Sequence, residues 1–397
     1  MLNRLRDDDN KITDSLRIVH LYHFFEPGMG YIENNLPLEE AKLGIKILVL
    51  ISGKGIWNAN RYLNDSENID LNHSISNPIY IKASLLKQIK LIYDFKPNIL
   101  FMPYLDIMIF PLTLLKFVLN YRIVSTIGMT IDVNRLSILK YVFYKLILFI
   151  SKLYLSNYVD LFVECTFANL DRNISIFKIP SDKIKFSPLG CNKLRFKRDE
   201  NNRSIIRKKY NIQKDNVVFI YGGKLLPEKN IHLLLDCFIV LSKYNQKVKL
   251  MLLGNGPKEY ESLLKAKILK NCLESNVIWI NFVSNEDLPK YYSAADIGVW
   301  PGAPSITIQE AMGCNLPIII KNSTHTSHLI KYKNGYKFDN GKQLYLYMYI
   351  LARDRNLRIE MGNLSRKLVE NELNWECIAN NILKLYKNIN SHEIHRL

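Results

Sequence analysis

The chain has 397 residues, of which 48% are hydrophobic and 23% are charged. This composition is typical of a globular protein and excludes a disordered chain, and the length predicts two domains rather than one core. The net charge of +17 favours anionic partners such as nucleic acid, an anionic membrane surface or phosphorylated substrates. Abundant Lys, Ile, Asn and Tyr can also reflect a biased genome, so the charge alone assigns no function.

The six cysteines are scattered along the chain and show neither a CxxC motif nor metal-ligand spacing. This pattern favours a reduced, cytoplasmic protein without structural disulfides. The N-terminal sequence MLNRLRDDDNK lacks the apolar core of a signal peptide. No stretch of about 20 residues is free of charge, so a membrane-spanning helix is not expected.

The first half of the chain alternates short β-branched stretches with helical patterns. A helix is expected over residues 30–43, directly after the first strand. Such alternation predicts a parallel sheet that is covered by helices on both faces. The expected strands are residues 17–22, 45–50, 98–102, 122–126 and 160–165.

The most hydrophobic region is residues 135–162, which three lysines interrupt. Basic and aromatic side chains are mixed over the wider stretch from Lys82 to Tyr158. Such a surface suits anionic lipid head groups, so peripheral contact with a membrane is one interpretation. A long amphipathic helix packed on its own domain, with lysines that extend to solvent, explains the same pattern.

The charge-dense segment 193–204 has no apolar period and is the best candidate for a linker. The alternation of strands and helices then resumes, which predicts a second doubly wound domain. Ligands are expected outside the carboxyl ends of the strands, in a cleft between the domains. The expected strands of this half are residues 216–223, 248–257, 276–282, 295–301 and 317–320.

An amphipathic helix is expected over residues 374–389, with Trp375 on its apolar face. It follows the last expected strand and could cross back to the first domain. The predicted organisation is therefore a first domain at 1–195, a second at 196–373, and a C-terminal helix within 374–397.

The stretch YGGKLLPEKN, residues 221–230, places Gly222 and Gly223 at the end of a strand, with Lys224 directly after them. Lys229 is expected to open the next helix. Glycines let a ligand approach the backbone closely, and a helix N-terminus offers free N–H groups. Two ammonium groups there suit a pyrophosphate as point charges. Two solvated lysines in an ordinary turn are the alternative.

A second glycine-containing turn, LLGNGP, holds Asn255 and Gly256 between a strand and a helix. It is a weak ligand signal, because it is not a GxGxxG motif and lacks the acidic partner of a dinucleotide site. In FFEPGMGYIENN, Gly28 and Gly30 follow the first strand and could face the other domain's ligand. Glu33 is expected in the first helical turn, where the helix dipole favours it, and an ordinary turn is the alternative.

The stretch PGAPSITIQEAMGCNLPIII, residues 301–320, holds one carboxylate, Glu310. An unpaired buried carboxylate is costly, so Glu310 should be solvated or bound by a polar group. Ser305 is expected to cap the helix that carries it, and Asn315 to end that helix in the left-handed conformation. Glu310 could then accept hydrogen bonds from ribose hydroxyls, beside free N–H groups around Ser305, Ile306 and Thr307. A helix that merely carries a Glu is the alternative.

Taken together and in order, these stretches resemble the retaining nucleotide-sugar glycosyltransferases of glycosyltransferase family 4, which have the GT-B fold of two Rossmann-like domains. The resemblance covers nearly the whole chain. Single motifs are weak, but their ordered series is specific. It is carried by PGMGYIENNLPLEEAKLGIKILVL, FSPLGCNKLRF, YGGKLLPEKNIHLLL, LLGNGP, VIWINFVSNEDLPKYYSAADIGVWP, IQEAMGCNLPIII and NWECIANNILKLY.

The resemblance implies that Lys224 and Lys229 bind the donor diphosphate and steady the leaving group, and that Glu310 holds the ribose. It implies that no metal or other cofactor is needed, because the lysines and helix dipoles supply the electrostatic role. The family has no firmly established protein nucleophile, and none is assigned here. The implied donor-binding residues are Gly30, Gly223, Asn255, Gly256, Ser305, Ile306, Thr307 and Ile308.

Two positions depart from the family pattern. Gly302 stands where the family usually has a second Glu, and Gly128 stands near a usual His, with Asp132 close by in sequence. The expected function is sugar transfer from a nucleotide diphosphate donor to a glycan or lipid-linked acceptor in surface polysaccharide biosynthesis. The expected location is cytoplasmic, with peripheral contact to the inner face of the cell membrane.

These departures keep a non-catalytic relative that binds sugar nucleotides or glycans as the main rival. Another GT-B enzyme, such as an epimerase or a phosphorylase, is a second rival, and the absence of a recognisable cofactor-lysine motif counts against it. Nucleic acid is not an expected partner, because only the net charge favours it and no known module is present.

Overall fold

The computed structural model describes residues 16–23, 25, 28–51, 77–102, 109–126 and 157–391. The chain forms two compact units. The N-terminal unit comprises Met1–Pro27, Tyr31–Pro188 and Ile378–Leu397, and the C-terminal unit comprises Gly28–Gly30 and Leu189–Cys377. Most of the hydrophobic region at 135–162, together with Gly128 and Asp132, lies outside the described residues.

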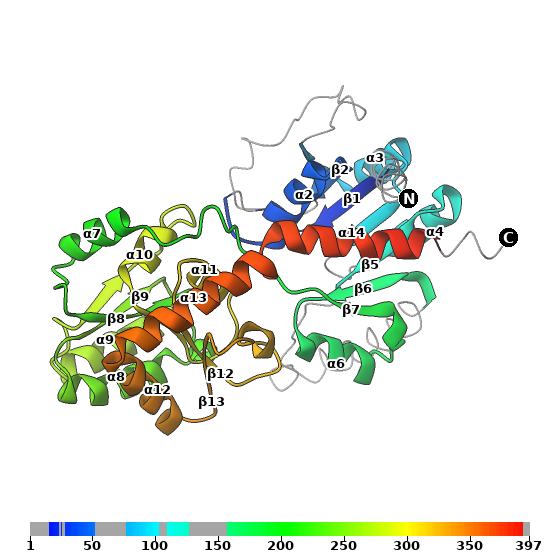
Figure 1. Ribbon diagram of the computed structural model, residues 1–397. Helices are drawn as coiled ribbons and strands as arrows, with labels where there is room; N and C mark the ends of the chain where they lie inside the picture. The colour runs from blue at the N-terminus through cyan, green and yellow to red at the C-terminus, as the bar shows by residue number, and fades with distance from the viewer. Residues whose placement is uncertain are drawn as a thin grey trace, which may run out of the picture. The chain divides into compact units, whose positions relative to one another are not determined.

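The N-terminal unit is built on a parallel sheet of seven strands in the order β3-β2-β1-β4-β5-β6-β7 (Figure 1). The chain runs outward from β1 to one edge, returns, and continues to the other edge, which is the doubly wound arrangement. The strands are β1 (Arg17–Tyr22), β2 (Lys46–Ile51), β3 (Ile79–Lys82), β4 (Ile99–Met102), β5 (Arg122–Ser125), β6 (Leu161–Glu164) and β7 (Ile184–Phe186).

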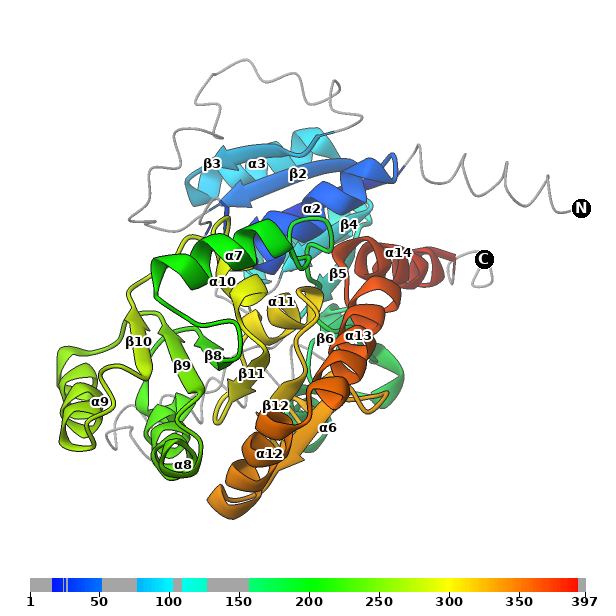
Figure 2. The ribbon, with the colours of Figure 1, turned by 60° about the vertical axis from the view of Figure 1, so that its left-hand side comes forward.

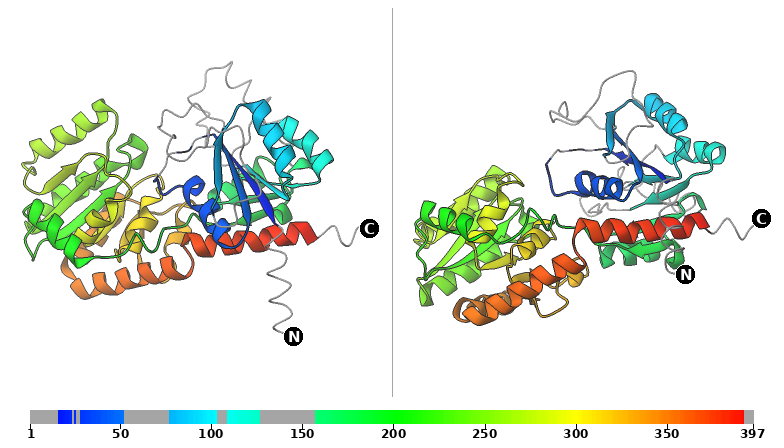
Figure 3. Two further views of the ribbon diagram at one scale, coloured as in Figure 1. Left: turned by 90° about the horizontal axis from the view of Figure 1, so that it is seen from above. Right: turned by 45° about the horizontal axis from the view of Figure 1, so that its top comes forward.

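Helices cover this sheet, and the last of them comes from the end of the chain. From Ile378 onward α14 belongs to the N-terminal unit (Figure 3), and its Tyr386 is fully buried. Glu33 lies in the first turn of α2, as predicted. The helices are α2 (Ile32–Lys42), α3 (Leu85–Phe95), α4 (Ile109–Leu119), α6 (Phe167–Ser175) and α14 (Trp375–Ser391), with the short η3 (Ser181–Lys183) before β7.

The expected linker at 193–204 is a wrong prediction, because helix α7 (Glu200–Lys209) begins inside it. Asp199 caps this helix by accepting a hydrogen bond of 2.7 Å from the Asn202 N–H. Phe196 is buried in the core of the C-terminal unit. The segment looks polar in sequence because it packs through a charged side chain: Arg203 donates to the main-chain oxygens of Ser293, Ala294 and Ala295.

The C-terminal unit has a parallel sheet of six strands in the order β10-β9-β8-β11-β12-β13. The strand order reverses between β8 and β11, which makes their carboxyl ends the usual place for a ligand. All residues of β8 are buried, as expected for a strand covered on both faces. The strands are β8 (Val217–Gly222), β9 (Val248–Leu253), β10 (Val277–Ile280), β11 (Ile297–Trp300), β12 (Ile318–Lys321) and β13 (Gly335–Phe338).

Helices on both faces complete this unit (Figure 2). Helix α8 packs against α9 and α12, α7 packs against α10, and α11 packs against α13. Asn315 ends α11 in the left-handed conformation, as predicted (φ 59°). The remaining elements are α8 (Ile231–Tyr244), α9 (Lys258–Lys270), α10 (Leu288–Ala294), α11 (Thr307–Gly313), α12 (Gly341–Arg353), α13 (Arg355–Asn371), η4 (Pro227–Lys229) and η5 (Ser327–Leu329).

Two findings concern the cysteines and the lengths of the helices. All six cysteines lie in the described part of the chain, and each is a free thiol. Among the helices that the structure describes, none combines the length and the apolar character that crossing a bilayer requires.

Candidate functional site

The loops after β8 and β11 meet at the point where the strand order of the C-terminal unit reverses. The Thr307 hydroxyl donates to the main-chain oxygen of Gly222 over 2.6 Å, and the Trp300 indole N–H donates to the same oxygen over 3.0 Å. Two groups from the β11 side therefore hold the end of β8. This contact brings the lysine turn and the stretch around Glu310 together, as the sequence predicts.

Lys229 ends the short turn η4 rather than opening a helix, which corrects the expectation. Helix α8 begins at Ile231, after Asn230 in the left-handed conformation (φ 59°). The Lys229 ammonium donates to the main-chain oxygens of Ala303 (3.2 Å) and Pro304 (2.5 Å). Burial lowers the pKa of Lys229; the nearby charge of Glu228 opposes this effect, and that of Lys224 adds to it. Lys229 thus points at the loop after β11, and Lys224 beside it is exposed.

Gly302 lies in that loop, where the backbone leaves no room for a side chain. A Cβ at Gly302 would overlap the main-chain atoms of Glu228 and Lys229, and the next residue, Ala303, donates its N–H to the Glu228 oxygen over 3.0 Å. The Glu that the family usually has at this position would not fit this conformation. The close packing of the backbone at this position therefore requires glycine instead of the usual Glu.

Ser305 does not cap α11, which is a second correction. The cap position is Ile306, and no side chain bonds the helix end. The Ser305 and Thr307 hydroxyls instead lie 2.8 Å apart, and Ser305 is the donor of this pair because the single Thr307 hydroxyl hydrogen goes to the Gly222 oxygen. The N–H of Ile308 donates to the Ser305 oxygen over 3.2 Å, so it is not available to a ligand. For the N–H groups of Ile306 and Thr307, the described residues supply no acceptor.

Glu310 is almost completely buried, with 1% of its surface exposed. Asn285 donates its side-chain N–H to Glu310 Oε1 over 2.7 Å, and Arg195 donates to the Asn285 oxygen over 2.7 Å. Within the described part of the chain, Glu310 Oε2 has no hydrogen-bond partner. Burial raises the pKa of Glu310 to about 7, while Asn285 and then Arg195 act to lower it.

Gly30, which groups with the C-terminal unit, lies against this carboxylate. A Cβ at Gly30 would overlap Glu310 Oε1 and come within 3.3 Å of the Asn285 amide nitrogen. Only a glycine leaves space for the carboxylate there. The carboxylate is covered, so a ligand would reach Glu310 Oε2 only after neighbouring atoms move.

The turn after β9 packs against the turn after β8. A Cβ at Gly256 would overlap the Leu225 oxygen, and the Leu225 N–H donates to the Asn255 oxygen over 2.9 Å. The Asn255 side chain accepts from the Phe282 N–H over 3.1 Å. Gly223 adopts a positive φ of 144°. Asn255 and Gly256 therefore shape the turn that carries Lys224.

No sequence pattern pointed to Asn285 or Arg195. Asn285 lies between β10 and α10, and Arg195 lies before α7, so neither is near Glu310 in sequence. No spacing rule links an amide to a carboxylate in another strand–helix unit. The described residues contain no group of His, Cys, Asp and Glu side chains that could hold a metal ion.

Residues 202–368 match the family model described as Glycosyl transferases group 1. The chain is 28% identical over 182 residues to "Spore coat protein SA" of Bacillus subtilis (strain 168), covering 43% of this chain and 48% of that protein. It is 26% identical over 213 residues to the "Capsular polysaccharide biosynthesis glycosyltransferase CapM" of Staphylococcus aureus, covering 51% of this chain and 55% of that protein. The chain spans about half the length of these curated relatives.

Among solved structures, the chain is similar to Anabaena Alr3699/HepE in complex with UDP. The TM-score is 0.75 at 15% identity, and the match covers 94% of this chain and 100% of that one. A likeness at this identity shows the fold. The GT-B fold predicted from the sequence is confirmed.

Proposed function

We propose, from the match of residues 202–368 to the family model of Glycosyl transferases group 1, that this protein transfers a sugar from a nucleotide diphosphate-sugar to an acceptor. One observation carries the proposal. The matched segment brings Lys224 and Lys229 to the reversal point of a doubly wound sheet, together with Glu310 Oε2, for which the described residues supply no hydrogen-bond donor. A buried acceptor without a donor is costly, and a ligand hydroxyl would supply the missing hydrogen bond.

In this proposal the two lysines bind the diphosphate and stabilise the charge that develops on it as the bond to the sugar breaks. Glu310 Oε2 accepts a hydrogen bond from a ribose hydroxyl. The N–H groups of Ile306 and Thr307 contribute to donor binding. No metal is proposed, since two ammonium groups at the site can balance the diphosphate charge. We further propose retention of configuration, which rests on the family resemblance alone.

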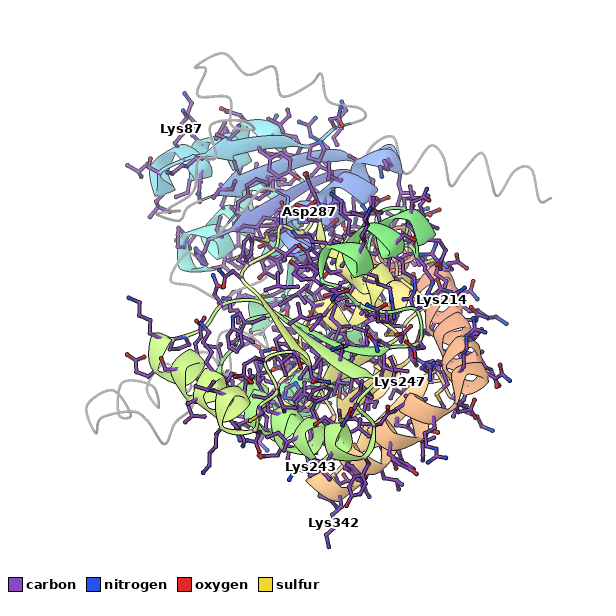
Figure 4. All side chains as sticks on the ribbon, turned by 90° about the vertical axis from the view of Figure 1, so that its left-hand side faces the viewer. Lys87, Lys214, Lys243, Lys247, Asp287 and Lys342 are labelled. Atoms are coloured by element: carbon purple, nitrogen blue, oxygen red, sulfur yellow. The ribbon has the colours of Figure 1, made fainter. Side chains whose placement is uncertain are left out.

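The proposed acceptor is a glycan or a lipid-linked sugar in surface polysaccharide synthesis. The similarity to CapM, which is named for capsular polysaccharide biosynthesis, supports this class. The N-terminal unit also exposes apolar side chains on α3 and α4, beside the exposed Lys87 and Lys90 of α3 (Figure 4 labels Lys87). Apolar groups mixed with lysines suit an anionic bilayer. We therefore propose peripheral membrane contact from the cytoplasmic side.

The first test is a thermal-shift screen against UDP, GDP, ADP, TDP and CDP and their sugar conjugates, because a ligand that binds the folded protein raises its stability with the logarithm of its concentration over its Kd. Lys229→Ala should weaken binding of the matching nucleoside diphosphate about tenfold or more, the cost of a charged hydrogen bond. It should leave binding of the free nucleoside unchanged. Lys243→Ala, on the exposed last turn of α8 (Figure 4), is the matched control.

Equal losses for the nucleoside and its diphosphate would remove the phosphate role of Lys229. No shift with any nucleotide, from folded protein, would count against the donor site as a whole.

A donor-binding protein without transferase activity is the second candidate, and Gly302 favours it, since the family's usual carboxylate has no space there. The two functions separate in one experiment. The nucleotide-sugar that gives the largest thermal shift is incubated with the protein and membrane lipids. Release of nucleoside diphosphate that depends on Lys229 supports transfer. Binding without release supports the second candidate.

A further inference from the structure

Three side chains from different parts of the C-terminal unit form a hydrogen-bonded row that ends at Glu310. Arg195 Nη1 donates to Asn285 Oδ1 over 2.7 Å, and Asn285 Nδ2 donates to Glu310 Oε1 over 2.7 Å. Asn285 is 7% exposed and Glu310 is 1% exposed, whereas Arg195 is exposed. The row therefore leads from the surface to a buried carboxylate.

Arg195 determines which groups donate and which accept in this series of hydrogen bonds. A guanidinium group can only donate hydrogen bonds, so the amide oxygen of Asn285 must face it. The amide nitrogen then faces Glu310 and can only donate. Glu310 Oε1 is held as the acceptor of that bond, and Oε2 is left as the oxygen without a partner in the described part of the chain.

We propose that Asn285 is a positioning residue for the donor site. It holds the Glu310 carboxylate so that Oε2 is presented to a ribose hydroxyl, and Arg195 keeps the amide in the donating orientation. This inference rests on the proposed ribose-binding role of Glu310. It adds two residues that do not touch the donor but determine how firmly the carboxylate is held.

The other groups that face Glu310 do not compete with it for a proton near neutral pH. Its electrostatic neighbours are the thiols of Cys191 and Cys314, the phenol of Tyr292 and the cation Arg195. Burial raises the pKa of both thiols and of the phenol, so they stay neutral. Glu310 is thus the group among them that changes charge in the neutral range.

Asn285 also affects when Glu310 is ionised. Its hydrogen bond lowers the pKa of Glu310 against the effect of burial. Removing the Asn285 amide removes a hydrogen bond that stabilises the ionised carboxylate. The pKa of Glu310 should then rise above about 7, because burial still disfavours the ionised form. Ribose binding to an ionised carboxylate would then require a higher pH.

The experiment measures the Kd of each nucleoside diphosphate that stabilises the wild type in the screen above, of its nucleoside, and of inorganic pyrophosphate. These are measured across pH for Asn285→Ala, Glu310→Gln and the double variant. Asn285→Ala should weaken nucleoside and diphosphate by the same factor, about tenfold, and leave pyrophosphate unchanged. The pH midpoint of nucleoside binding should move upward.

The double variant tests whether Asn285 acts through Glu310. When Glu310 is already Gln, Asn285→Ala should add no further loss, because interacting residues are not additive. A full additional loss would overturn the positioning role, and so would unchanged nucleoside affinity in Asn285→Ala. If Glu310→Gln itself leaves nucleoside binding intact, the ribose role of Glu310 fails first, and the inference fails with it.

Two further variants guard against a simple folding defect. Arg195→Gln changes an exposed residue and should weaken nucleoside binding in the same direction by a smaller factor. Asn334 is a buried amide that donates to the Leu329 oxygen over 2.9 Å in the same unit. Asn334→Ala should lower stability without moving the pH midpoint. An equal midpoint shift in Asn334→Ala would show that the effect is general and overturn the inference.

Discussion

At the scale of single residues, Glu310 combines burial, one donor and one partnerless oxygen. Only Asn285 among the described residues donates to it, and burial raises its pKa to about 7. The fold therefore holds a proton on Glu310 more tightly than the unfolded chain does. Glu310 Oε2 can therefore accept a hydrogen bond from a ligand hydroxyl. Without the ligand, this buried carboxylate is poorly solvated, which is unfavourable.

This raised pKa predicts how the stability of the ligand-free protein depends on pH. The stabilising contribution of Glu310 is present below its unfolded pKa of 4.5 and is lost as the pH rises through about 7. From about pH 5 to about pH 8, wild type should lose roughly 2 kcal/mol more unfolding free energy than Glu310→Gln. Urea unfolding of both proteins at a series of pH values measures this difference, and parallel profiles would contradict it.

At the scale of elements, α3 and α4 carry large apolar side chains that are exposed to solvent. On α4, Leu114, Phe117 and Val118 are 71%, 73% and 69% exposed. On α3, Leu86 is 80% exposed and Tyr93 is 51% exposed. The two helices pack against each other. The exposed apolar residues of these neighbouring helices, with Lys87 and Lys90 of α3, are called the α3–α4 face below.

If this face contacts a bilayer, the triple variant with Ser at 114, 117 and 118 should lose binding to vesicles that contain anionic phosphatidylglycerol. Burying each of these side chains stabilises the bound state by about 1.5–3 kcal/mol. The affinity for vesicles in a flotation assay should therefore fall at least about tenfold. Leu263→Ser with Leu269→Ser, two exposed leucines on α9, is the matched control. Equal binding by the triple variant would contradict the membrane face, as would binding to neutral vesicles alone.

Most elements could be predicted because strand and helix periods are local properties of the chain. Helix α7 could not be predicted, because one of its buried residues is the charged Arg207. Its burial becomes understandable only in the folded structure, where the guanidinium donates to main-chain oxygens. The turn at Lys229 was assigned to a helix because the left-handed Asn230 leaves no clear sequence signal. Asn285 was missed for a different reason: its partner Glu310 belongs to another strand–helix unit, and only the folded sheet brings them together.

At the scale of the whole molecule, each unit has its own sheet and its own core. The proposed donor contacts lie in the C-terminal unit. A ligand protects the parts of a protein that it stabilises. Donor binding should therefore be visible as a local effect and not as uniform tightening of the chain.

Hydrogen exchange with and without the stabilising nucleoside diphosphate tests this expectation. Exchange should slow in the turns after β8 and β11 and in α11, and stay unchanged in β1, β2 and β3. Lys229→Ala at the same nucleotide concentration should show less protection. Equal slowing in both sheets would place the binding elsewhere or make it global.

Helix α14 begins in the C-terminal unit, where Trp375 fills the space beside Gly190, and its residues from Ile378 onward complete the N-terminal unit. Domains generally fold as they are synthesised, the N-terminal one first. Here the N-terminal unit is translated first but lacks this helix until the residues after Cys377 have been made. The C-terminal unit, whose sheet is continuous in sequence, can finish before it. The order of completion is thus the reverse of the order of synthesis.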